Sequence, residues 1–148
     1  GAKNELAKAQ GLDLYIETQF CFEAKPIIEW DKAIRDAGNE LPIHIGVPGL
    51  ATVKTLMKHA VACGIGNSMN FLKKQALNVT KLMTVNAPDR LVRDLAAYHA
   101  TDPNCGIDMA HMYPLGGLKK TAAWTRAVQD GKFELKTKGG FTVTVPIE

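Results

Sequence analysis

The sequence lacks the features that mark membrane proteins, disulfide scaffolds and secreted proteins. No apolar run approaches the ~20 residues that a membrane-spanning helix needs, and the first residues show no apolar signal region. The cysteines, Cys21, Cys63 and Cys105, are odd in number, far apart and without a CxxC pair. Such spacing disfavours a disulfide framework or a structural zinc site. We therefore expect a cytoplasmic protein that does not contact membranes.

The sequence also lacks a strong charge imbalance and a metal-binding pattern of histidines. Its 18 Lys and Arg residues exceed its 15 Asp and Glu residues by only three, and the basic residues are scattered. A charge this mild does not predict a nucleic-acid partner. His44, His59, His99 and His111 show no ligand spacing such as HExxH, so we predict no metal site.

The composition is otherwise that of an ordinary globular domain, with 46% hydrophobic, 22% charged and 7% aromatic residues. A chain of this length can bury about 68% of the surface that it exposes when unfolded. The sequence shows no repeat, linker or low-complexity tract. These features predict a single domain over residues 1–148.

Strands and helices are predicted to alternate along the chain. Aromatic and β-branched residues predict strands over residues 12–22, 41–47 and 106–115. Stripes at helical spacing predict helices over about residues 4–10, 26–38, 51–62, 88–101 and 118–129. In the second of these helices, Ile27, Trp30 and Ile34 share one face. The alternation favours a parallel sheet with right-handed crossovers.

Two other segments complete the expected organisation. Asn67 or Ser68 could cap an additional helix, and residues 78–86 fit no single element. Near the end of the chain, two alternating runs separated by a glycine-containing turn at 138–140 predict a β-hairpin within an extension over residues 131–146.

Functional groups of parallel α/β folds gather where strands end and helices begin. Gln19 lies near such an end. Its amide either forms hydrogen bonds with the edge of a planar heterocycle or caps backbone groups in the core. Tyr113 either stacks on a ligand or fills the core. Gly116 and Gly117 fit either an anion site or an ordinary turn. Cys21 shares a strand face with Gln19 and is expected to be a small buried thiol.

Three segments together resemble the methylenetetrahydrofolate reductase family. Residues 18–23, TQFCFE, resemble that family's TQFFFD strand. Residues 43–49, followed by an amphipathic helix, resemble its next strand, IIPGILPV. Residues 106–115, which end in HMYPL, resemble its last barrel strand, HFYTL. The order and approximate spacing agree from about residue 6 to residue 128.

The resemblance implies a fold and a chemistry. The family is a flavin-dependent (β/α)₈ barrel that uses NAD(P)H to reduce FAD and passes hydride to 5,10-methylenetetrahydrofolate. We therefore expect a partial (β/α)₈ TIM barrel, an α/β fold made of the last three strand–helix units plus the C-terminal hairpin. We expect a truncated reading frame, an isolated C-terminal part, or a chain that assembles with another copy. The chain alone is expected to be inactive and to hold no catalytic residue.

The resemblance also assigns binding residues. Gln19 matches a glutamine that hydrogen-bonds the folate pterin, and Tyr113 matches a tyrosine beside the nicotinamide and folate pocket. Thr55 and His59 stand where the family has a glutamine and a phenylalanine that pack on folate. Lys8 falls near a lysine that meets the flavin phosphates. The LNR that follows the last strand in the family is replaced here by residues 115–117, LGG.

Three functions follow as expectations. The first is part of a flavin-dependent methylenetetrahydrofolate reductase-like oxidoreductase of one-carbon metabolism that contributes to the folate-binding face. The second is a protein that binds a reduced folate or a methyl carrier without flavin reduction. The third is a non-catalytic half-barrel that forms a homo-oligomer through its open sheet edges.

Overall fold

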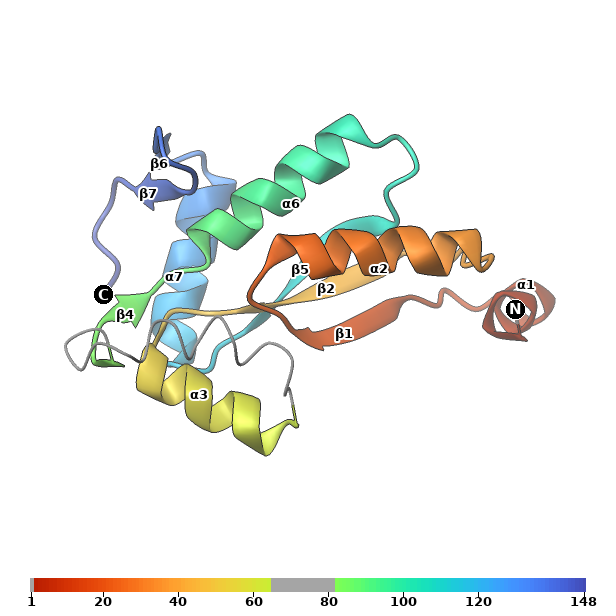
Figure 1. Cartoon of the computed structure of the whole chain (residues 1–148), viewed down its shortest axis with the longest axis horizontal. Helices are drawn as coiled ribbons and strands as arrows, with labels where there is room; N and C mark the ends of the chain where they lie inside the picture. Colours follow the sequence, from red (N-terminus) through yellow and green to blue (C-terminus); the bar gives the residue numbers. More distant parts are fainter. Residues whose placement is uncertain (1, 65–81) are drawn as a thin grey trace.

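A three-stranded parallel sheet organises the chain. The computed structural model describes residues 2–64 and 82–148 (Figure 1). Its sheet has the order β1-β2-β5, formed by β1 (Ile16–Phe20), β2 (Ile43–Pro48) and β5 (Ile107–Tyr113). Ile43 of β2 lies opposite Ile16 on one side and Ile107 on the other. The carboxyl ends of all three strands therefore lie at one end of the sheet.

Helices cover one face of this sheet and both of its ends. α2 (Ala24–Asp36) and α6 (Asp89–Thr101) pack on the same face (Figure 1). α1 (Ala2–Gln10) lies beyond the amino end of β1, whereas α3 (Val53–Ala62) and α7 (Leu118–Gln129) gather near the carboxyl ends. None of the helices in the described part of the chain is long and apolar enough to span a membrane.

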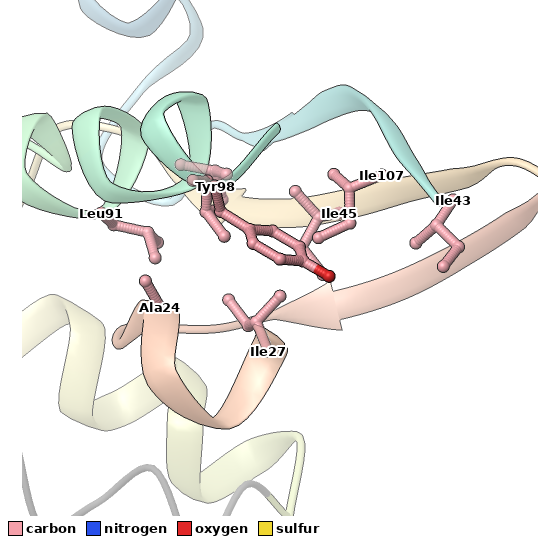
Figure 2. Packing of buried hydrophobic residues seen from close by; sticks show 9 residues of the cluster. Ala24, Ile27, Ile43, Ile45, Leu91, Tyr98 and Ile107 are labelled. Carbon is pink, nitrogen blue, oxygen red and sulfur yellow. The ribbon is translucent and has the colours of Figure 1, made fainter. Parts of the chain in front are cut away.

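The main core lies between β2 and the α2–α6 layer. Ile43, Ile45 and Val47 are at most 2% exposed, because alternate residues of a strand point to the same face. Figure 2 shows the ring of Tyr98 in this core, close to Ile27 and Ile45. The central strand is therefore the most buried element of the sheet.

A buried carboxylate fastens α2 to α6 and to the start of β5. Asp31 is 0% exposed, and its Oδ2 accepts a hydrogen bond of 2.6 Å from the Tyr98 hydroxyl. Arg35 Nε lies 3.4 Å from the same oxygen, and the Gly106 amide donates to Oδ1 over 3.3 Å. Burial, followed by the hydrogen bond to Asp31, raises the pKa of Tyr98, which keeps the phenol a neutral donor. Arg35 also pairs with Asp102 at 3.1 Å.

Two short antiparallel pairs complete the described strands. β3 (Ala51–Thr52) pairs with β4 (Val85–Asn86), and β6 (Phe133–Leu135) pairs with β7 (Phe141–Val143). The second pair is the hairpin that the alternating pattern predicts. Phe141 is buried and stacks on Trp124 of α7, with ring centroids 5.6 Å apart.

Asp89, the first residue of α6, binds the β6–β7 hairpin through its carboxylate. We expect Asp89→Ala to lower the free energy of unfolding by about 2 kcal/mol. Its Oδ2 accepts from the Phe141 amide over 3.1 Å and lies 3.1 Å from Lys136 Nζ. Lys136→Ala removes only a half-exposed ion pair and should change the free energy by less than about 1 kcal/mol. Urea denaturation measures both variants. Equal losses in the two would contradict a role for the bond to the Phe141 amide.

The predicted partial (β/α)₈ TIM barrel is wrong. Among the described strands, β1 and β5 each pair only with β2, and the others form separate antiparallel pairs. The result is an open sheet in an α/β fold, with α2 and α6 packed on the same face. Strand–helix alternation predicts parallel pairing, but it does not decide how many strands join or whether the sheet closes. The barrel came from the resemblance alone.

The element boundaries also differ from the predictions at some points. The first strand spans five residues rather than 12–22, because β2 begins at Ile43, opposite Ile16, and earlier residues have no strand to pair with. Part of the ambiguous segment 78–86 becomes β4. The additional helix expected after Asn67 or Ser68 lies outside the described residues.

Candidate functional site

A cavity of about 470 Å³ lies between the edge strand β1 and α2. We call it the β1–α2 cavity. Its wall is largely apolar, with Pro26, Ile27 and Trp30 contributed by α2. Gln19 and Glu23 contribute polar side chains from β1 and the segment that follows it. A mostly apolar wall with a few polar groups is typical of small-molecule sites.

Gln19 is exposed at this edge, within a bulge of β1. The register pairs Glu17 with His44 and Phe20 with Gly46, so β1 places one residue more than β2 between these pairs. The bulge brings the backbone of β1 close to Gly46 of β2. A β-carbon added at Gly46 would lie only 2.5 Å from the Gln19 carbonyl oxygen. Gln19 Oε1 accepts from the Phe20 amide over 3.2 Å. Within the described residues this is the only hydrogen bond of the side-chain amide, so its N–H groups are available to a ligand.

Two neighbours set the chemical character of the β1–α2 cavity. Burial raises the pKa of the Cys21 thiol, and this thiol donates to the Gln19 carbonyl at a distance of 3.4 Å. Cys21 is therefore a neutral wall residue rather than a nucleophile. Trp30 is 37% exposed, so part of its indole can meet a planar ligand.

Tyr113 braces β5 to β1 across the central strand. Its hydroxyl donates to the Thr18 carbonyl over 3.0 Å and lies 3.5 Å from Glu17 Oε1. Burial, followed by the charge of Glu17, raises the pKa of Tyr113. The Glu17 carboxylate also lies 3.3 Å from His111 Nδ1. The ring of Tyr113 packs edge-on against Phe20, with centroids 5.5 Å apart.

The structure thus brings Tyr113 next to Gln19 along β1 but does not place both in one cavity. Tyr113 contacts the bulge through Thr18, whereas Gln19 lines the β1–α2 cavity. Both residues are near the carboxyl end of β1. Their predicted roles in folate binding stay predictions.

Thr55 and His59 lie one turn apart on α3. The α3 residues buried toward Phe20 are Val53, Leu56 and Ala60; Thr55 and His59 lie on an adjoining, partly buried stripe. The Thr55 amide donates to Thr52 Oγ1 over 3.2 Å, and the two hydroxyls lie 3.0 Å apart. Thr55 therefore belongs to the N-terminal cap of the helix.

Lys8, the residue that the resemblance assigns to the flavin, does not line the β1–α2 cavity. Lys8, expected at the flavin phosphates, pairs with Glu40 at 2.5 Å and is 70% exposed. It lies on α1, beyond the amino end of β1 (Figure 1), while Gln19 is near the carboxyl end. Lys8 and Gln19 therefore do not form one site. No group of three or more His, Cys, Asp or Glu residues suited to a metal ion occurs within the described ranges.

No protein-family model matches the chain. Similarity to methylenetetrahydrofolate reductases therefore stays a prediction based on the three segments.

Sequence reasoning missed several residues of this region. Trp30 is predicted on one helix face with Ile27 and Ile34, yet of the three only Ile27 is buried, and Trp30 lines the β1–α2 cavity. The pairing of Glu17 with His111 joins residues 94 positions apart and leaves no local signal. Gly46, beneath the bulge, is part of a predicted strand, where a glycine often indicates a close backbone approach.

Proposed function

We propose that this protein binds a reduced folate, with the pterin ring in the β1–α2 cavity and Gln19 at the edge of the ring. One observation carries the proposal: Gln19, whose side-chain N–H groups have no partner among the described residues, lines an apolar cavity of about 470 Å³ together with Trp30. This volume lies within the range of about 300–1,000 Å³ that small-molecule sites occupy.

The chemistry of the pterin matches these side chains. Its pyrimidine half presents N–H donors beside a carbonyl acceptor, and a primary amide can both donate to and accept from such an edge. The carboxylate of Glu23, which also lines the cavity, can accept from the ring amino group. The indole of Trp30 offers an aromatic surface for the ring. Together these groups recognise a flat, polar-edged heterocycle.

The geometry favours folate binding without flavin reduction by the described residues. Reduction of methylenetetrahydrofolate through FAD and NAD(P)H stays a prediction of the resemblance. Association through open sheet edges also stays a prediction; β1 and β5 each have one edge without a partner strand in the described part of the chain.

Gln19→Ala is expected to weaken binding of 5-methyltetrahydrofolate by at least about tenfold, since one well-formed hydrogen bond contributes about 1.4 kcal/mol. Isothermal titration calorimetry measures the affinity, and quenching of Trp30 reports occupancy of the cavity. The other tryptophan, Trp124, is only 4% exposed and serves as an internal reference.

The matched control is Gln10→Ala, since Gln10 is exposed at the end of α1 and lines neither side of the β1–α2 cavity. Its affinity should equal that of the unmodified protein. Failure of the unmodified protein to bind 5-methyltetrahydrofolate would overturn the proposed function. So would equal losses in the Gln10 and Gln19 variants.

A further inference from the structure

A second cavity, of about 440 Å³, lies at the carboxyl ends of β1 and β2, between the first turns of α2 and α6. We call it the strand-end cavity. In open α/β sheets, ligands bind in the crevice outside the carboxyl ends of the strands. Its apolar lining includes Phe22, Leu56 and Leu91, which are 8%, 4% and 5% exposed. An apolar group of a ligand in this cavity would pack against these side chains.

Charged side chains of both signs surround this apolar lining. Glu23, Lys25, Arg90 and Asp94 all line the cavity and are exposed. The carboxylates of Glu23 and Asp94 make no hydrogen bond or ion pair with any residue in 2–64 or 82–148. Two acidic and two basic groups do not favour an ion of one sign. They favour a ligand that carries both charges.

Arg90 is held in place although it is exposed. Its Nη2 donates to the Lys138 carbonyl over 2.8 Å. Gly139 of the hairpin turn has a φ of +90°, and a β-carbon there would lie 3.3 Å from Arg90 Nε. The turn therefore packs closely on the guanidinium, which still has N–H donors to offer because it carries five. A side chain fixed in this way loses little entropy when it binds a carboxylate.

Asp94 is placed to bind the opposite charge. It follows Arg90 by four residues on α6, so both lie on one face of the helix, with β-carbons about 5–6 Å apart. The two side chains do not form an ion pair within 4.0 Å. An α-amino acid carries its carboxylate and its ammonium on a single carbon, so it can contact both groups together.

We propose that the strand-end cavity binds a free α-amino acid with an apolar side chain. The carboxylate is bound by Arg90, the ammonium by Asp94, and the side chain packs on Leu56 and Leu91. The two cavities share Phe22 and Glu23 in their linings, but Gln19 lines only the β1–α2 cavity, whereas Arg90 and Asp94 line only the strand-end cavity.

The test compares L-leucine with two analogues that each lack one charge: 4-methylpentanoate, without the ammonium, and isoamylamine, without the carboxylate. Calorimetry should give L-leucine an affinity at least about tenfold higher than either analogue. Arg90→Gln should make L-leucine bind no better than isoamylamine. Asp94→Asn should make it bind no better than 4-methylpentanoate.

Arg126→Gln is the control for the charge change, because Arg126 is exposed on α7 and does not line the strand-end cavity; it should leave L-leucine binding unchanged. Gln19→Ala should also leave it unchanged, which separates this proposal from folate binding. Urea denaturation checks that each variant is folded. The proposal is overturned if L-leucine does not bind, if 4-methylpentanoate binds equally well, or if neither Arg90→Gln nor Asp94→Asn weakens binding.

Discussion

Asp31→Ala is expected to lower the free energy of unfolding by about 3–5 kcal/mol, because it removes one partner from a buried charged network. Asp31 is fully buried and serves three groups: the Tyr98 hydroxyl, the Arg35 guanidinium and the Gly106 amide. Without the carboxylate, the phenol and the amide lose their acceptor inside the core. Urea denaturation followed by circular dichroism measures the loss.

Asp31→Asn provides a milder test if the alanine variant fails to fold. The amide keeps the shape of the side chain and can still accept from Tyr98, so the loss should be about half as large. Asp36→Ala is the matched control, since Asp36 is exposed at the end of the same helix and should change the free energy by less than about 0.5 kcal/mol. If Asp31→Asn and Asp36→Ala behave alike, the network does not stabilise the fold.

Gly46→Ala is expected to lower the free energy of unfolding by about 2–3 kcal/mol, because the added methyl overpacks the centre of the sheet. Its β-carbon would lie 2.5 Å from the Gln19 carbonyl oxygen and 2.7 Å from the Phe20 nitrogen. Both are backbone atoms, so relief of the clash requires β1 to move away from β2. The variant should also bind 5-methyltetrahydrofolate more weakly, because this movement displaces Gln19.

Ala110→Val supplies the comparison for Gly46→Ala. Ala110 lies on β5 opposite Ile45 and is exposed, so added methyl groups there should change the free energy by less than about 0.5 kcal/mol. Denaturation curves test the stabilities, and calorimetry tests the folate affinities. A Gly46→Ala protein as stable as the unmodified one would show that β1 does not need the close approach.

Much of the secondary structure was predictable because its signals are local. The helix over residues 118–129 begins and ends as its pattern predicts, and the hairpin of Phe133–Leu135 with Phe141–Val143 follows from alternation around a glycine turn. The β3–β4 pair was missed, because each of its strands contains only two residues and such short segments carry no periodicity.

The candidate site was predictable only in part. Gln19 is a candidate from the sequence because it is an amide within a strand-like run and lies in the segment TQFCFE, which resembles TQFFFD. Its bulge was not predictable, since a bulge depends on the register between β1 and β2. Helical spacing places Trp30 on one face with Ile27 and Ile34, but it does not show where burial along that face stops.

By itself, the amino-acid sequence determined the approximate positions of the described helices, the parallel strands and the C-terminal hairpin, because these signals depend on neighbours within a few positions. Only the tertiary structure decided that three strands form the parallel sheet of the described residues, that Asp31 contacts Tyr98 across 67 positions, and that Gln19 and Trp30 line the same cavity. These outcomes depend on strand register and helix placement, which arise from packing between segments far apart in the chain.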